Sequence, residues 1–169
     1  MKRVIFALFI FSSILLAESK WAVFSDYGRS RDKIDVYRIG VRYYFSDWLH
    51  QKGLSDSFGG YFEGSLNYWN GKKDNIFAVA ISPVFYYQFN PKGYVRPYIE
   101  GGIGATYISK TKIDNRNLSI HFQFEDRIGI GVKVGDFDFH IRYMHYSNAN
   151  LKKPNNGIDI YMVGVSYSF

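Results

Sequence analysis

The sequence predicts an all-β protein, an eight-stranded antiparallel transmembrane β-barrel. Three observations support this fold. Aromatic residues make up 20% of the chain and glycine (16) far outnumbers proline (4), a composition that favours strands over helices. Apolar and polar residues alternate with a period of two along most of the chain, with no helical periodicity. The N-terminus has the pattern of an export signal.

The N-terminal segment predicts a secretory signal peptide. Two basic residues precede a mostly apolar run from Val4 to Leu16, and the small-x-small sequence AES follows. We expect a signal peptide over residues 1–19, cleaved after Ala17 or Ser19, and a barrel over residues 20–169; the alternative is an uncleaved anchor. No later segment reaches about 18 consecutive apolar residues, so membrane embedding would use strands. Cysteine is absent from the chain, which excludes disulfides and thiol chemistry.

The first four predicted strands are alternating segments that each end in a turn-rich break. Glycine, asparagine, aspartate, serine and proline accumulate in these breaks because they fit the backbone of turns. The strands and the breaks that end them are 20–28 (GRSRD), 33–46 (SDWLHQKGLSD), 57–69 (NGKKDN) and 75–89 (NPKG).

The last four strands follow by the same criterion: 94–108 (SKTKIDNRNL), 119–133 (VGD), 137–147 (NANLKKPNNG) and 158–169. The final strand ends on Tyr167-x-Phe169, and a terminal Phe in an alternating strand resembles the C-terminal signature of bacterial outer-membrane proteins. Nothing in the chain indicates a linker or a second domain.

The two faces of the predicted strands decide between a barrel and a soluble β-sandwich. In nearly every strand one face is apolar or aromatic, and the other carries charges such as Arg38, Glu63 and Arg142. A sandwich would bury the apolar face and leave the charges in water. An outer-membrane barrel does the reverse, with aromatics towards lipid and paired charges inside. Eight strands leave room only for side chains, so the interior is predicted to be packed and not a pore.

Basic residues concentrate in the breaks predicted to face the cell exterior. An even number of strands places both termini on the periplasmic side, so the first, third, fifth and seventh breaks lie outside. They hold ten basic residues against only Asp32, Asp74 and Asp114: Arg29, Arg31, Lys33, Lys72, Lys73, Lys110, Lys112, Arg116, Lys152 and Lys153. This excess predicts attraction to anionic lipopolysaccharide headgroups, against the alternative of simple solvation. A nucleic-acid partner does not fit an exported barrel.

Three reactive side chains are predicted to share one outward surface. His145 and Ser147 follow Phe139, Ile141 and Tyr143 in phase, and a hairpin brings Asp159 beside them from the last strand. Polar groups on a lipid-facing surface are costly, so a group of three indicates function. Together they supply a nucleophile, a base and an orienting carboxylate. A one-residue slip in strand 137–147 would turn His145 and Ser147 inward.

The segment HYSNA (145–149), followed by KKPNNG (152–157) and a terminal strand, resembles the PagL family of outer-membrane lipid A 3-O-deacylases. These enzymes are eight-stranded barrels that hydrolyse the 3-position acyl ester of lipid A with a Ser-His-Glu triad on the outer surface. The resemblance is close over 145–169 and elsewhere limited to strand pattern. It implies Ser147 as nucleophile, His145 as general base, Asn148 in the oxyanion hole and Asn155 as a supporting residue. Asp159 replaces the family's glutamate and is one methylene shorter.

The resemblance implies lipid A as substrate, outer-membrane lipids as surroundings and a site towards the cell exterior, without a cofactor. No metal site is predicted because His50, His121 and His140 do not cluster with other ligands. Two rivals remain open: a non-enzymatic structural or adhesive barrel, and another lipid enzyme such as a palmitoyl transferase. The sequence leaves open whether the barrel is a monomer or a homodimer.

Overall fold

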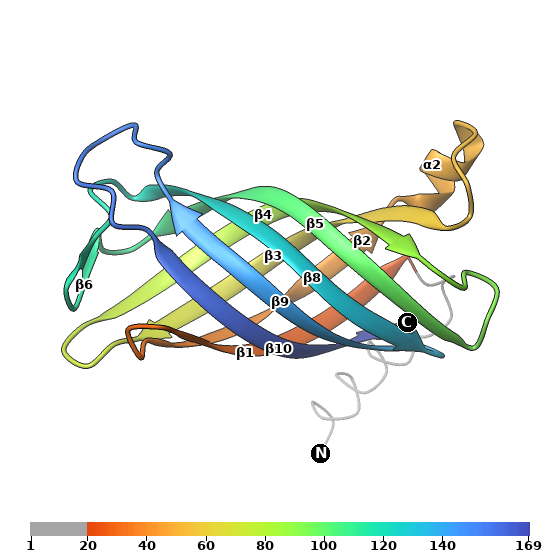
Figure 1. Ribbon diagram of the computed structural model, residues 1–169, viewed down its shortest axis with the longest axis horizontal. Coiled ribbons are helices and arrows are strands. Elements are labelled where there is room, and N and C mark those ends of the chain that lie inside the picture. The colour runs from red at the N-terminus through yellow and green to blue at the C-terminus, as the bar shows by residue number, and fades with distance from the viewer. Residues whose placement is uncertain (1–19) are drawn as a thin grey trace, which may run out of the picture.

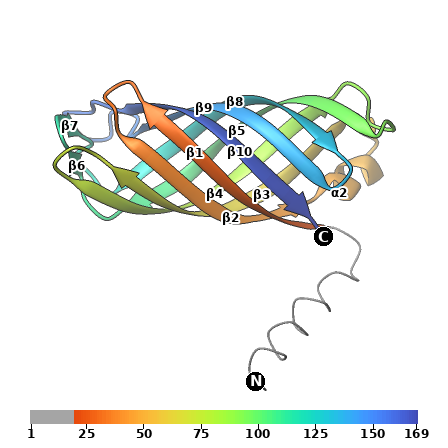
Figure 2. The same cartoon turned by 90° about the horizontal axis from the view of Figure 1, so that it is seen from below.

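A computed structural model describes residues 20–169, so the predicted signal peptide (1–19) lies outside the described residues. Eight long strands form one closed barrel in the order β1-β10-β9-β8-β5-β4-β3-β2, every pair antiparallel (Figures 1 and 2). The barrel strands are β1 (Trp21–Ser30), β2 (Asp35–Tyr44), β3 (Phe58–Asn70), β4 (Asn75–Gln88), β5 (Val95–Ile108), β8 (Phe122–Val134), β9 (Phe137–Ser147) and β10 (Ile158–Ser168). The predicted all-β, eight-stranded barrel is confirmed.

Three short elements lie in the connections between the barrel strands. β6 (Lys112–Ile113) and β7 (Arg116–Asn117) form a small hairpin between β5 and β8. α2 (Ser46–Gln51) occupies the break after β2, where the sequence indicated no helix. Its six residues are too few to show a helical period, and only Leu49 among them is buried. Among residues 20–169, no helix is long and apolar enough to cross a membrane.

The four connections β1–β2, β3–β4, β5–β8 and β9–β10 gather at one end of the barrel, which we call the loop end (Figure 1, left). The opposite end carries α2, the turns β4–β5 and β8–β9, and the C-terminus. The predicted strand at 119–133 begins only at Phe122, because Ser119 takes a left-handed backbone with φ 64°.

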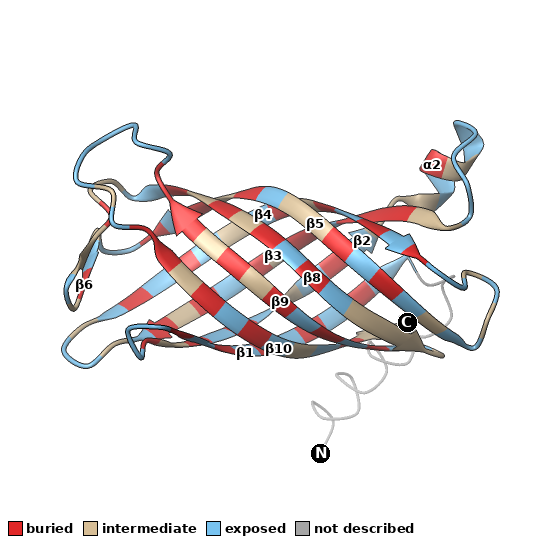
Figure 3. Cartoon of the chain, in the orientation of Figure 1, coloured by how far each residue is buried: buried red, intermediate tan, exposed pale blue. Residues whose placement is uncertain are grey.

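Buried and exposed residues alternate along each strand, as the banded colouring of Figure 3 shows. The exposed apolar residues form layers along the barrel axis. Aliphatic residues such as Ile39, Ile81 and Ile130 lie at mid-height, and aromatic residues such as Trp21 and Tyr107 lie near the strand ends. An aliphatic band between aromatic girdles is the outer surface expected of a barrel in lipid.

The interior holds a network of ion pairs together with two buried apolar clusters, one around Trp69 and one around Tyr61. Arg142 on β9 donates from Nε to Glu100 (2.5 Å) and from Nη1 to Asp26 (3.1 Å). Arg38 Nη2 donates hydrogen bonds to the carboxylates of Glu63 (3.1 Å) and Glu125 (3.2 Å). Each side chain in these contacts is fully enclosed, as the sequence predicted for a packed polar core. Since removing one partner of a buried pair leaves an uncompensated charge, this network resists changes of strand register. It therefore forms a rigid wall for the outer surface.

Candidate active site

The phase of β9 is fixed from inside the barrel. Met144 and Tyr146 are fully buried, and the Tyr146 hydroxyl donates to interior Glu125 (2.8 Å). Because side chains alternate along a strand, His145 and Ser147 lie on the outer side, as predicted. The one-residue slip that would turn them inward does not occur.

His145 and Asp159 face each other across β9 and β10. They are register partners, and His145 Nδ1 lies 2.7 Å from Asp159 Oδ1. Asp159 therefore reaches the imidazole without the extra methylene of a glutamate. Both side chains are about one-third exposed, at 38% for His145 and 35% for Asp159. A carboxylate at Nδ1 holds the proton there and leaves Nε2 as the basic nitrogen.

Tyr143 is a further member of this group that the sequence reasoning missed. Its hydroxyl donates to the same Oδ1 atom of Asp159 (2.7 Å). The signal was present in the sequence, because Tyr143 is two residues before His145 and shares its face. Two donors converging on one carboxylate oxygen restrict the rotation of Asp159 and thereby orient the imidazole.

Ser147 is the last residue of β9 and retains 9% of its surface exposed. The backbone N–H of Ala149 donates to its Oγ at 3.4 Å. Within residues 20–169, no hydrogen bond joins Ser147 to His145. Residues two apart on a strand are about 7 Å apart at Cα, so a rotamer change can bring the hydroxyl to Nε2.

The loop after Ser147 is held by Asn148 and Asn155. The Asn148 side chain is buried, and its Nδ2 donates to the carbonyl oxygens of Leu118 (2.9 Å) and Lys152 (2.8 Å). The Asn148 backbone N–H donates to Asn155 Oδ1 (3.2 Å). The side-chain NH2 group and the backbone N–H of Asn148 are thus both engaged in holding the loop. The donor to Ser147 Oγ is instead the Ala149 N–H.

The backbone turns sharply at this point. Ala149 (φ 50°) and Asn150 (φ 63°) are both left-handed, and the Leu151 N–H donates to the Asn148 carbonyl (3.0 Å). Two successive left-handed residues with this bond are typical of a type I′ turn. The turn directs the Ala149 N–H back towards Ser147.

Gly157 packs directly against the imidazole of His145. Its φ is +57°, and a Cβ at this position would lie 2.9 Å from His145 Cε1. The sequence reasoning assigned Gly157 no role. Only glycine combines this backbone with this closeness, so Gly157 sets the position of His145.

We expect Gly157→Ala to lower the rate of the ester hydrolysis that the sequence predicts roughly ten- to hundredfold, because the methyl group must displace the imidazole. Gly135→Ala is the matched control: Gly135 has a similar φ of +59°, and its nearest neighbour, Tyr94, lies at an ordinary 3.5 Å. Initial rates on micellar substrate measure the effect. Equal losses in both variants would show that backbone strain, and not contact with His145, is responsible.

A second carboxylate flanks His145 from the other side. Asp126 on β8 is the register partner of His145 and, unlike its neighbours Glu125 and Arg127, points outward. The sequence reasoning overlooked it, although the inward phase of Glu125 and Arg127 already implied its direction. Among the described residues, Asp126 makes no hydrogen bond to His145, and no group of three or more His, Cys, Asp or Glu side chains could hold a metal ion.

Known proteins resemble this chain in sequence and in fold. The family model described as "Lipid A 3-O-deacylase (PagL)" matches residues 35–168. The "Lipid A deacylase PagL" of Pseudomonas aeruginosa is 36% identical over 132 residues, 75% of this chain and 73% of the relative. The protein of the same name from Bordetella bronchiseptica is 43% identical over 75 residues, 44% of this chain and 42% of the relative. A crystal structure of the outer membrane enzyme PagL superposes with a TM-score of 0.77 at 31% identity, covering 88% of this chain and 99% of that one.

Proposed function

The chain belongs to the PagL family of lipid A 3-O-deacylases, and we propose that Ser147, His145 and Asp159 are the triad that carries out its ester hydrolysis. The protein is an outer-membrane β-barrel enzyme, a hydrolase of carboxylic esters whose substrate is lipid A. The observation that supports the triad is the 2.7 Å contact between His145 and Asp159 on the outer surface, two residues from a serine at the strand end.

The proposed chemistry proceeds in two steps. His145 Nε2 takes the Ser147 proton while Oγ attacks the carbonyl carbon of the 3-position ester. The tetrahedral intermediate collapses, the sugar oxygen leaves with the proton from His145, and the acyl group stays on Ser147. Water, deprotonated by His145, then attacks the acyl-enzyme; the fatty acid is released, and His145 returns the proton to Ser147 Oγ. Every proton transfer is assigned to His145, so the scheme requires no cofactor.

The oxyanion is stabilised, in this proposal, by the backbone N–H of Ala149. This group donates to Ser147 Oγ at 3.4 Å, so it lies next to the carbonyl oxygen of an ester that Oγ attacks, where the negative charge develops. Asn148 and Asn155 support the oxyanion hole by holding the turn that aims this N–H. Asp159 keeps Nδ1 protonated and stabilises the imidazolium formed in each step.

The site lies at the loop end. This end faces the cell exterior if the start of β1 and the end of β10, which lie at the opposite end of the barrel, are on the periplasmic side. Outward side chains at this height meet the outer leaflet from the side. The ester of a lipid A molecule embedded in the leaflet can therefore approach Ser147 laterally, without entering the barrel.

The test is mass spectrometry of lipid A after incubation with the refolded protein and with His145→Ala. We expect loss of one 3-hydroxyacyl chain with the parent protein only. A gain of acyl mass would indicate a transferase, and unchanged lipid A with a folded parent would indicate a structural or adhesive barrel. Either result would overturn the proposal.

Two further expectations from the sequence belong to this proposal. Export would remove the signal peptide predicted within residues 1–19, by cleavage after Ala17 or after Ser19. The intact mass of the protein purified from membranes tests this expectation. Homodimerisation is tested by light scattering of the protein in detergent.

A further inference from the structure

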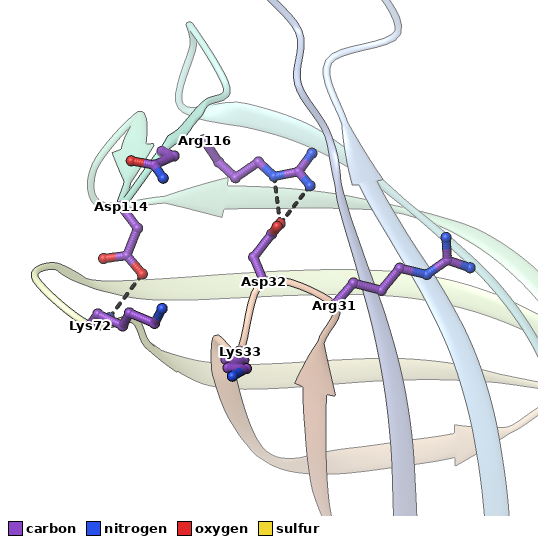
Figure 4. A pocket seen from close by; sticks show the side chains of 7 residues that line it. Arg31, Asp32, Lys33, Lys72, Asp114 and Arg116 are labelled. Carbon is purple, nitrogen blue, oxygen red and sulfur yellow. Dashed lines mark hydrogen bonds and ion pairs between the residues drawn. The ribbon is translucent and has the colours of Figure 1, made fainter.

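Two turns and one hairpin at the loop end surround a cleft of about 250 Å³. It lies between the β1–β2 turn, the β3–β4 turn and the β6–β7 hairpin (Figure 4). Its lining is mostly charged: Arg31, Asp32, Lys33, Lys72, Asp114 and Arg116. Four basic residues therefore face two acidic ones.

Both acidic residues are already engaged in holding the cleft together. Asp114 accepts the backbone N–H groups of Lys72 (2.8 Å) and Lys73 (2.9 Å), which hold the pKa of its carboxyl below the usual value. Asp32 accepts from Arg116 Nε (2.6 Å). The carboxylates thus tie the hairpin to the two turns, as the dashed lines in Figure 4 show.

The remaining cations have no such partner. Within residues 20–169, the ammonium groups of Lys33 and Lys72 form no ion pair, and Arg31 donates only to the hydroxyl of Tyr161 (3.0 Å). The two unpaired ammonium groups beside one cleft repel each other unless an anion enters, while the Arg31 guanidinium is directed towards Tyr161 (Figure 4). A phosphate monoester, with up to two negative charges and several acceptor oxygens, fits this arrangement of donors.

Two chains of contacts join the cleft to the triad. Arg116 Nη1 donates to the carbonyl oxygens of Asn156 (2.9 Å) and Gly157 (3.4 Å), and Gly157 packs on His145. On the other side, Arg31 donates a hydrogen bond to the Tyr161 hydroxyl. The ring centroids of Tyr161 and Tyr143 are 5.4 Å apart, and the Tyr143 hydroxyl donates to Asp159. The cleft and the reactive serine are therefore parts of one surface.

We propose that this cleft binds a phosphate group of the same lipid A molecule whose ester is cut at Ser147. The inference rests on the proposed function. Binding the phosphate holds the disaccharide over the loop end while its acyl chains remain in the leaflet. The cleft thus positions the substrate and selects phosphorylated lipid A.

The test compares kcat/KM for two substrates in mixed micelles: lipid A, and the same lipid A after enzymatic removal of its phosphates. Lys33→Gln/Lys72→Gln removes two cations from the cleft without breaking the backbone bonds that hold it. Lys112→Gln/Lys153→Gln is the matched control, since it removes the same charge from exposed positions at the loop end outside the cleft.

We expect the parent protein to prefer phosphorylated lipid A about tenfold, through KM. The cleft variant loses this preference, and the control variant keeps it. Equal losses in both double variants would overturn the proposal in favour of diffuse charge attraction. So would equal rates of the parent protein on both substrates.

A third arm identifies the source of the phosphate. Phosphatidic acid added to micelles of dephosphorylated lipid A must not restore the rate; restoration would mean that the cleft binds a neighbouring lipid, and would contradict the proposal. Failure of the proposed function is distinguishable, because the parent protein would then deacylate neither substrate.

Discussion

Ser147→Ala is expected to reduce lipid A deacylation by roughly 10⁵-fold or more while the barrel stays folded. The substitution removes one hydroxyl, whose described hydrogen bond is the long contact from the Ala149 N–H. Because Ser147 lies at the end of β9, no interior ion pair changes. Initial rates of fatty-acid release measure the loss.

Folding is checked separately by the heat-dependent electrophoretic mobility of the barrel. Ser166→Ala is a useful contrast, because Ser166 is a buried interior serine that accepts a hydrogen bond from Arg42. We expect it to affect barrel stability and not the chemical step. An active Ser147→Ala protein would eliminate this residue as the nucleophile.

Asp159→Asn is expected to lower kcat about 10³- to 10⁴-fold. The amide keeps the shape of the carboxylate but loses its charge, so it neither fixes the Nδ1 tautomer nor stabilises the imidazolium. The hydrogen bond from Tyr143 can still form, so the barrel surface is preserved. The rate is measured at saturating lipid A.

Asp126→Asn is the matched control, because Asp126 flanks the same histidine from β8 in the same register row. We expect less than about a threefold change, since among the described residues no hydrogen bond or ion pair joins its carboxylate to the imidazole. A large loss of activity in Asp126→Asn, together with an active Asp159→Asn protein, would show that Asp126 and not Asp159 orients the imidazole.

The outward direction of the proposed triad could be predicted because a strand has a period of two. Once Phe139 and Ile141 are assigned to lipid, the outward placement of His145 and Ser147 follows. The pairing of Asp159 with His145 also followed, because a single hairpin joins their strands. These inferences need only phase and neighbouring strands.

The parts that the sequence did not reveal depend on contacts between loops. The bonds from Asn148 to Leu118 and Lys152 bring together loops from different hairpins, and no periodicity records them. The closeness of Gly157 to His145 arises from one left-handed residue in a ten-residue connection. The basic cleft likewise requires the β6–β7 hairpin, which is too short to read from a pattern.

The question of the shorter acidic residue is answered by register. Direct pairing across β9 and β10 places the Asp159 carboxylate 2.7 Å from Nδ1. An aspartate at this position can therefore reach His145 with the strands in regular alignment. Asp159→Glu, in contrast, must bend its longer side chain to keep both the His145 and the Tyr143 contacts.

The most direct test of the central claim is the intact mass of the refolded protein after treatment with a long-chain alkyl fluorophosphonate. Activated Ser147 Oγ attacks phosphorus and displaces fluoride, which leaves one stable adduct. We expect one adduct per chain, mapped to Ser147 by peptide mass spectrometry and absent from Ser147→Ala and His145→Ala. An adduct on another serine, or equal labelling of the variants, would contradict the assignment of the triad.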